Sequence, residues 1–213
     1  MAFYNRDGKA VLEHIVAAIQ ENKAYLSEID GLIGDGDHGI NMNKGFTMFG
    51  ERMKGREVGF AEGLDELGCL LFGEIGGSMG PIYGTVFSDM AEAGDRYDEI
   101  GVKELAAMLD AGLTGLCEIV EAHVGDKTIV DTLTPARDAM KAAAVQGTDL
   151  KTALEEMKKA AAAGRDSTKD MQARFGRSAR LGARSKGVLD AGAASCCLIL
   201  TAMADGIIGV LEW

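Results

Sequence analysis

The sequence predicts an all-α protein with about eight helices in a single domain. Apolar residues recur at helical spacing along most of the 213 residues. No run of strand length alternates Val, Ile or Thr with polar residues, so no β-strand is expected. The chain has only 2 prolines, no Pro/Ser-rich linker and no shift in composition, which favours one domain over residues 1–213.

The first helix is predicted from an apolar stripe near the N-terminus. Val11, Leu12, Ile15, Val16 and Ile19 have the spacing i, i+1, i+4, i+5 and i+8, which places them on one helical face. A second helix-like run ends at the glycine-rich turn that begins near residue 33. Later helical windows cover residues 41–54, 60–75, 80–93, 102–123, 134–146, 150–174 and 190–210.

Two of these windows carry helix-start signals. Thr134 followed by Pro135 predicts an N-cap with proline at the first helical position. Thr148 and Asp149 precede the window 150–174, and either side chain suits an N-cap. Alanine is plentiful in the later windows, which favours helix formation and close approach between helices.

Glycine is unusually frequent, with 29 in 213 residues, above the usual share of about 7%. The glycines cluster at element junctions, in the ranges 31–39, 76–84 and 182–192 and at Gly125. If the helices form a bundle, these clusters are its loops, and loops with unusual chemistry often share one end of a fold.

Composition narrows the function classes. The net charge of −11 argues against nucleic acid or an acidic membrane as partner, because both demand clustered Lys and Arg. The Lys and Arg residues that gather between Lys151 and Lys186 are expected on solvated helix faces, with a local role toward an anionic ligand as the alternative.

The cysteines and the apolar runs indicate the cellular compartment of the protein. Cys69, Cys117, Cys196 and Cys197 form no CxxC pair and are predicted to be reduced core residues of a cytoplasmic protein. The N-terminus lacks the apolar stretch of a signal peptide. The longest apolar run, AASCCLILTAMA, is too short to span a bilayer, so no membrane contact is expected.

The stretch IGDGDHGINMNKGF, residues 33–46, follows Asp30 and concentrates acid at a glycine-rich turn. Asp30, Asp35 and Asp37 form the pattern D-x4-D-x-D, so a turning backbone brings three carboxylates together. A divalent cation relieves their repulsion, and oxygen ligands suit Mg²⁺, which usually also binds substrate phosphates. The alternative is an Asp/Gly turn with N-capping carboxylates. The bidentate glutamate of an EF-hand is missing.

His38 and Asn41 flank this turn. A lone histidine is more often a structural group with its hydrogen bonds formed than a catalyst. A metal-dependent phosphohydrolase is a further alternative, and His38 is the nearby base that it would need to activate water. Asn41 lies where the next helix is expected to begin, so its amide is predicted either to cap that helix or to face a ligand.

A second glycine-rich stretch, GEIGGSMGPIYGTVF, spans residues 73–87 and leads into a predicted helix. Free backbone N–H groups at a helix start bind anions, whereas the alternative is a plain helix–helix corner. The stretch is not a Walker A loop. Together with an acidic metal turn, a loop that cradles phosphate indicates a nucleotide site.

Four stretches, in this order, resemble the signature motifs of the L subunit of dihydroxyacetone kinases: IGDGDHGINMNKGF, GGSMGPIYGTVF, VGDKTIVDTLTPA and MQARFGRSARLGARSKGVLDAGA. The resemblance covers nearly the whole chain. It implies a barrel-like bundle of eight antiparallel helices. It also implies that Asp30, Asp35 and Asp37 hold two Mg²⁺ ions, which clamp the phosphates of bound ADP or ATP.

By the same matching, the other nucleotide-binding positions come from the glycine-rich stretches and the loops near residues 128, 177 and 190. They are His38, Asn41, Gly77, Ser78, Met79, Gly80, Thr128, Ile129, Arg177, Asp190 and Gly192. No catalytic residue is assigned on this chain beyond the metal site, because phosphoryl transfer needs positioning and cations more than a protein nucleophile.

The resemblance implies a phosphotransferase that acts with a separate K-type subunit, which holds a small ketose. In three-subunit systems of this family ADP stays bound, and a phosphotransferase-system protein rephosphorylates it. This chain resembles the L subunit alone, so a K-type partner is expected, with either ATP or a phosphotransferase-system protein as the phosphodonor. The alternatives are a non-catalytic ADP-binding regulatory module and an ATP-dependent kinase subunit for another ketose or ketose acid.

The chain departs from the family pattern around the expected pocket. The family loop commonly reads Gly-Gly-Ala-Ser-Gly, so Met79 replaces a hydroxyl that faces phosphate. Val188, Leu189 and Ala191 fall in a stretch that commonly reads Gly-His-x-Asp-Pro-Gly, and Val120 matches a glycine that contacts the base. We therefore expect Mg²⁺–phosphate binding to be kept and nucleotide affinity, exchange rate and sugar to be affected.

Overall fold

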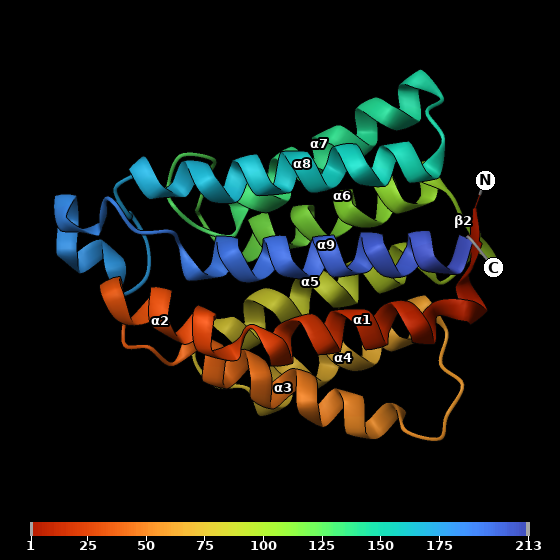
Figure 1. Cartoon of the computed structure of the whole chain (residues 1–213), viewed down its shortest axis with the longest axis horizontal. Helices are drawn as coiled ribbons and strands as arrows, with labels where there is room; N and C mark the ends of the chain where they lie inside the picture. The colour runs from red at the N-terminus through yellow and green to blue at the C-terminus, as the bar shows by residue number, and fades with distance from the viewer. Residues whose placement is uncertain (1, 212–213) are drawn as a thin grey trace.

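The computed structural model describes residues 2–211. Within them, nine α-helices run alternately up and down and close into a barrel-like bundle (Figure 1). They are α1 (Gly8–Glu21), α2 (Lys23–Ile33), α3 (His38–Met53), α4 (Phe60–Glu74), α5 (Met79–Gly94), α6 (Val102–Ile119), α7 (Val130–Gln146), α8 (Leu150–Ser167) and α9 (Ala191–Leu211). The predicted all-α, barrel-like fold is therefore confirmed.

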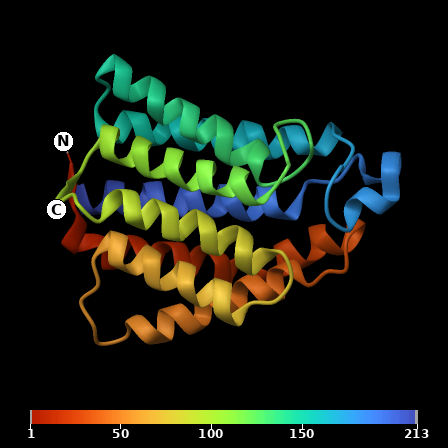
Figure 2. The same cartoon turned by 180° about the vertical axis from the view of Figure 1, so that it is seen from behind.

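The helices form a closed ring in which neighbours along the chain are mostly neighbours in space. From α3 to α9 each helix packs against the next, and α1 closes the ring through contacts with α9 and α3. Figure 2 shows α4, α5 and α6 side by side on the face opposite to that of Figure 1. Helix α2 continues beyond α1 after Asn22 and packs against α3.

The interior of the ring is the apolar core. All five residues of the N-terminal stripe are at most 7% exposed, so the predicted face of α1 is the buried one. Helix α9 packs against α1, α7 and α8. Its buried alanines allow the close approach that the alanine-rich sequence predicted.

Helix starts were predicted with mixed success. Asp149 is the N-cap of α8, where its Oδ1 accepts the N–H of Thr152 at 3.0 Å. The Thr134–Pro135 start is wrong, because α7 begins at Val130 and Pro135 lies inside it. The reason is that Asp131, inside the first turn, accepts the N–H groups of Gly125 and Thr128 and so fixes the start earlier.

Other boundaries also differ from the sequence windows. The window 102–123 ends at Ile119, since Val120 has an extended backbone, and the window 150–174 ends at Ser167. A 3-10 turn, Thr168–Asp170, follows α8, and another 3-10 segment covers Ser178–Ser185. The expectation of no strand is wrong in one small respect: β1 (Phe3–Tyr4) pairs antiparallel with β2 (Glu99–Ile100).

Helix α9 has the length and apolar composition of a membrane span, the one such helix within residues 2–211. The predicted window 190–210 agrees with this helix of 21 residues, whereas the uninterrupted apolar run AASCCLILTAMA covers only part of it. In the bundle it lies among other helices, as the core helix of a globular protein does. Its Cys196 and Cys197 are buried, whereas Cys69 and Cys117 are exposed and are not the core residues we expected.

The glycine-rich loops gather at one end of the bundle. The segments between α2 and α3, α4 and α5, α6 and α7, and α8 and α9 lie at the end opposite to the β1–β2 pair (Figure 1). This follows from the up-and-down path of the chain, which returns to the same end after every second helix. The predicted sharing of one end by unusual loops is confirmed.

Candidate functional site

A cavity of about 400 Å³ opens at the end where these loops meet. The first residues of α3, α5, α7 and α9 all line it: His38, Met79, Val130 and Ala191. Four helix N-termini therefore border one space, and their positive dipole ends favour an anionic ligand.

The cavity brings together nearly all of the site residues predicted from the sequence. Those that line it are Asp30, Asp35, Asp37, His38, Asn41, Gly77, Ser78, Met79, Thr128, Ile129, Arg177, Asp190 and Gly192. Gly80 is the exception: it lies behind the loop, where an added Cβ would be 2.2 Å from the main-chain oxygen of Ile75. The role this geometry gives Gly80 is close packing of α5 on the end of α4.

The three aspartates converge at one side of the cavity. Asp30 lies in the last turn of α2, Asp35 in the following loop and Asp37 directly before α3. One oxygen from each lies within 4.8 Å of those of the other two. Gly36 has φ +76°, a left-handed conformation that lets the loop turn back. Three oxygens at this spacing fit a hard divalent cation such as Mg²⁺, with waters or ligand oxygens completing its coordination.

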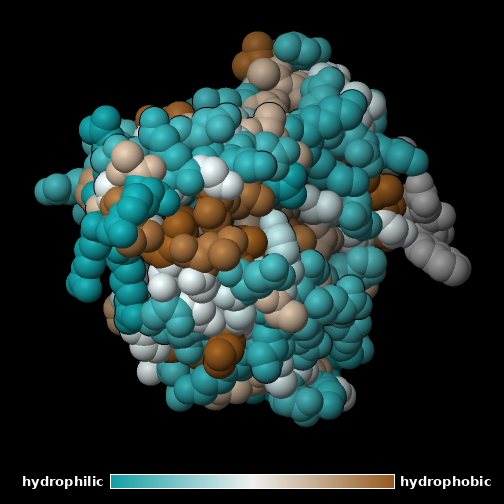
Figure 3. Space-filling model, turned by 60° about the vertical axis from the view of Figure 1, so that its left-hand side comes forward, coloured by the Kyte–Doolittle hydropathy of each residue, from teal (hydrophilic) through white to brown (hydrophobic). Residues whose placement is uncertain are grey.

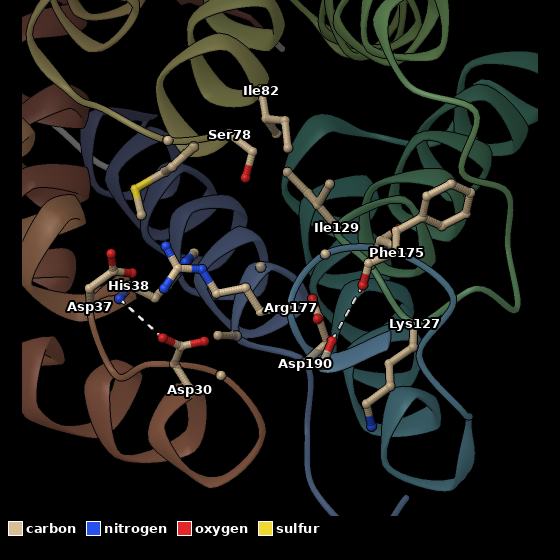
Figure 4. Close-up of a pocket in the computed structure, with 18 of the residues that line it drawn as sticks. Asp30, Asp37, His38, Ser78, Ile82, Lys127, Ile129, Phe175, Arg177 and Asp190 are labelled. Atoms are coloured by element: carbon tan, nitrogen blue, oxygen red, sulfur yellow. Dashed lines mark hydrogen bonds between the residues drawn. The ribbon is translucent and has the colours of Figure 1, made fainter. Parts of the chain in front are cut away.

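Arg177 provides a positive charge next to these carboxylates. Its Nη1 forms an ion pair with Oδ2 of Asp35, and Figure 4 shows the side chain reaching across the cavity toward the acidic turn. Both side chains are partly exposed. A guanidinium in this place is able to pair with a carboxylate or with the phosphate of a ligand, since it binds both groups in the same geometry.

His38 is held from two sides. Its backbone N–H donates to Oδ2 of Asp30 at 3.4 Å, and its Nε2 is 2.8 Å from Oγ of Ser195. Burial lowers the pKa of His38 to about 4, although the Asp30 carboxylate opposes this shift. The ring is therefore neutral at pH 7 and is a weak base, which argues against the phosphohydrolase alternative.

Asn41 is not a helix cap. Helix α3 begins at His38, so Asn41 is its fourth residue, and Asp37 occupies the N-cap position. The side chain instead lines the cavity, which agrees with the alternative that Asn41 faces a ligand.

The loop between α4 and α5 forms another wall. Gly77 is open, because a Cβ added there would meet no atom within 4 Å. Ser78 occupies the N-cap position of α5. Met79 is 8% exposed, packs into the core and also lines the cavity, so a thioether stands at the start of this helix.

The wall across from the carboxylates is apolar. Ile82, Val120, Ile129 and Phe175 line it, and Figure 4 shows Ile129 and Phe175 on the side away from the acidic turn. Figure 3 shows apolar side chains gathered on this face of the molecule within a hydrophilic surround. A cavity with one apolar side and one charged side suits a ligand that joins a flat apolar group to an anionic one.

Asp190 lies between these two walls, directly before α9. Its Oδ2 accepts the N–H of Ala193 at 2.8 Å, which caps the first turn of the helix. Burial raises the pKa of Asp190 to about 6, and the Lys127 ammonium opposes this shift.

The sequence patterns missed Lys127. This lysine is 1% exposed and has φ +64°, which is uncommon for a residue with a side chain. Its Nζ donates to the main-chain oxygens of Thr168 and Val188, at 2.6 and 2.5 Å, so it ties the loop before α7 to the segments after α8. Burial lowers the pKa of Lys127, and nearby carboxylates, chiefly that of Asp190, oppose the shift.

Comparison with protein families matches residues 32–205 to the DAK2 domain. Among curated proteins, the chain is 35% identical over 186 residues to the ADP-binding subunit DhaL of PEP-dependent dihydroxyacetone kinase 1 from Listeria innocua, covering 87% of this chain and 88% of that protein. It is also 35% identical over 183 residues to the ADP-binding subunit DhaL of Escherichia coli, covering 84% and 86% respectively.

Longer kinases also contain a similar region. The L-erythrulose 1-kinase of Mycolicibacterium smegmatis is 32% identical over 202 residues, which is 92% of this chain but 34% of that protein. Among solved structures, the dihydroxyacetone kinase of C. freundii in complex with AMP-PNP and Mg²⁺ superposes with a TM-score of 0.72 at 22% identity, over 96% of this chain and 34% of that one. This last likeness shows the fold.

Proposed function

This chain belongs to the DAK2 domain family, and we propose that it is the nucleotide-binding subunit of a dihydroxyacetone-type kinase. The observation that carries the proposal is the meeting of the three carboxylates with four helix N-termini and an apolar wall around one cavity. Each part matches one part of a Mg²⁺–nucleotide: the cation, the phosphates and the base.

The acidic turn would hold the cation. Asp30, Asp35 and Asp37 would ligate Mg²⁺, two ions by the family resemblance, and bound Mg²⁺ supplies charge neutralisation for phosphoryl transfer. Arg177, which pairs with Asp35, would turn to the phosphates when the cation takes its place. The chain's own contribution is to position the phosphates and to stabilise their charge.

The phosphates and the base would occupy the rest of the cavity. The open backbone at Gly77 and Ser78 and the start of α5 lie where phosphate oxygens would accept N–H groups. Thr128, Ile129, Asp190 and Gly192 line the far side, where the base and ribose would lie. His38 and Asn41 would contact the nucleotide beside the cation.

The phosphoryl acceptor would be a small ketose held by a separate K-type subunit. This part of the proposal rests on the names of the relatives, several of which are subunits of PEP-dependent or PTS-dependent dihydroxyacetone kinases. A phosphotransferase-system protein would then rephosphorylate the ADP in place, in the cytoplasm. Nothing in the −11 net charge suits nucleic acid or an acidic membrane as partner.

Another ketose is the second candidate for the phosphoryl acceptor. A kinase subunit for another ketose is the alternative. It is favoured by the 32% identity to an L-erythrulose 1-kinase and by Met79 after the loop between α4 and α5. If the chain binds ADP and transfers phosphate to no ketose in the presence of K-type subunits, the remaining alternative is the non-catalytic ADP-binding regulatory module.

The experiment is calorimetric titration of ADP with and without Mg²⁺. We expect Mg²⁺-dependent binding in the native chain and its loss in Asp35→Ala, because one of three cation ligands is gone. The matched control is Asp95→Ala, an exposed aspartate at the C-terminal end of α5, which should bind as the native chain does. Unchanged binding in Asp35→Ala would refute the metal assignment.

A further inference from the structure

A hydroxyl on α9 connects the starts of three helices. Ser195 is fully buried, and its Oγ is 2.6 Å from Oη of Tyr83 and 2.8 Å from Nε2 of His38. Ser195 and Tyr83 are each the fifth residue of their helix, α9 and α5, and His38 is the first residue of α3. This group of three side chains therefore links the acidic turn, the start of α5 after the loop between α4 and α5, and the start of α9.

The proton on each atom of the group follows from its neighbours. Ser195 Oγ also lies 3.0 Å from the main-chain oxygen of Ala191 and 3.1 Å from that of Gly192, and both of these oxygens only accept. A hydroxyl inside a helix donates to the carbonyl one turn back. Tyr83 Oη is 2.6 Å from Ser195 Oγ and 3.2 Å from the main-chain oxygen of Gly192, so the shorter contact favours donation to Ser195. The single proton of Ser195 then points at the two carbonyls, and its lone pairs accept from Tyr83 and His38.

With this arrangement Nε2 of the neutral His38 ring carries the proton, and Nδ1 carries the lone pair. Nδ1 has no hydrogen-bonding partner among the described residues. Within the same residues, Ser27 Oγ is the one fully enclosed side-chain oxygen or nitrogen that lacks a partner, so Nδ1 is not fully enclosed. His38 lines the cavity, which makes Nδ1 an available acceptor there.

We propose that Tyr83 and Ser195 are positioning residues, which hold His38 with its proton on Nε2 and with Nδ1 as an acceptor toward the ligand side of the cavity. Water on the cation and the ribose hydroxyls would be donors that suit Nδ1, whereas ionised phosphate oxygens offer no proton. The nature of the ligand rests on the proposed function, whereas the tautomer of His38 is a property of the ligand-free chain.

The first test is ¹⁵N nuclear magnetic resonance of the histidine-labelled, ligand-free chain at pH 7.5. The chain has 3 histidines, so the spectrum of His38→Gln assigns the His38 signals by difference. We expect the native ring in the Nε2–H form. In Ser195→Ala the signals should move toward the average of the two tautomers, and Tyr83→Phe should show a smaller shift in the same direction.

The matched control is Ser27→Ala, which removes a buried hydroxyl near the acidic turn that has no partner. Its His38 signals should equal those of the native chain. A native ring in the Nδ1–H form, or native signals in Ser195→Ala, would overturn the proposal.

The second test measures Mg²⁺–ADP affinity by calorimetry. Loss of a hydrogen bond that orients a ligand-facing ring should weaken binding about tenfold in Ser195→Ala, and less in Tyr83→Phe. Ser27→Ala should bind as the native chain does, and equal affinity in all four proteins would overturn the positioning role. If the native chain binds no nucleotide, the proposed function fails, whereas the resonance experiment still decides the tautomer.

Discussion

Met79 is the site residue whose side-chain chemistry differs most from that of the residue commonly found at this position in the family. It starts α5, where an N–H-rich helix end faces the cavity, and it is also packed into the core. A thioether is a weak acceptor and no donor, so it adds nothing to the binding of phosphate oxygens. If this loop holds phosphate, its backbone N–H groups and the Ser78 hydroxyl would do so without help from the side chain of residue 79.

Restoring a hydroxyl at this position should therefore tighten nucleotide binding. Met79→Ser removes buried packing, which costs stability by itself, so the matched variant is Met79→Ala, with the same loss but no hydroxyl. We expect Met79→Ser to bind Mg²⁺–ADP about fivefold more tightly than Met79→Ala, from one added hydrogen bond of roughly 1 kcal/mol. Equal affinities in calorimetry would mean that this loop no longer holds phosphate.

The role of a single residue was predictable from the sequence where its partners are close to it along the chain. Asp30, Asp35 and Asp37 fall within one turn, so their convergence follows from their spacing. Lys127 and Ser195 bond to partners 41 and 157 residues away, and no local pattern reveals such pairs. Ser195 is a hydroxyl residue within the apolar α9. Because a buried polar group needs a hydrogen-bonding partner, this was the only sign in the sequence that Ser195 has one.

At the scale of elements, the packing of α2 against α3 places the acidic turn. The two helices approach closely at Gly39, where an added Cβ would lie 2.1 Å from the main-chain oxygen of Lys23 and 2.7 Å from the nitrogen of Ser27. Asp30 leaves from one helix and Asp37 precedes the other, so a change in their separation moves the carboxylates apart.

Gly39→Ala should therefore destabilise the chain by roughly 1–3 kcal/mol, as overpacking does, and weaken Mg²⁺–ADP binding. The control is Gly73→Ala on α4, where an added Cβ meets no atom within 4 Å. It should gain about 0.5–1 kcal/mol from helix propensity and bind normally. Urea unfolding and calorimetry check both variants; native stability in Gly39→Ala would contradict the close packing.

The sequence located the helices better than it located their ends. Periodicity is repeated over several turns, whereas each boundary depends on a few hydrogen bonds. Asp149 caps α8 through its own side chain, so that start was visible in the sequence. The start of α7 depends on Asp131 binding backward to Gly125 and Thr128, and the Thr134–Pro135 signal was misleading. A two-residue strand pair is too short to leave a pattern.

At the scale of the whole molecule, the up-and-down path of the chain builds the site. Helices that start at the same end bring four N-termini to one cavity, and their intervening loops supply the carboxylates and the open backbone. The family resemblance predicted the barrel, and the structure shows why it serves the site: rigid helices hold loops that are far apart in sequence. The assignment of residues 1–213 to one domain stays a prediction.

The central claim is that this one cavity binds Mg²⁺–ADP. The most direct test is native mass spectrometry of the chain purified with Mg²⁺ throughout, measured before and after addition of ADP. We expect one ADP per chain together with Mg²⁺, either retained from purification or acquired on addition, and its loss in Asp35→Ala. A native chain without ADP in both measurements would show that the cavity does not bind the nucleotide.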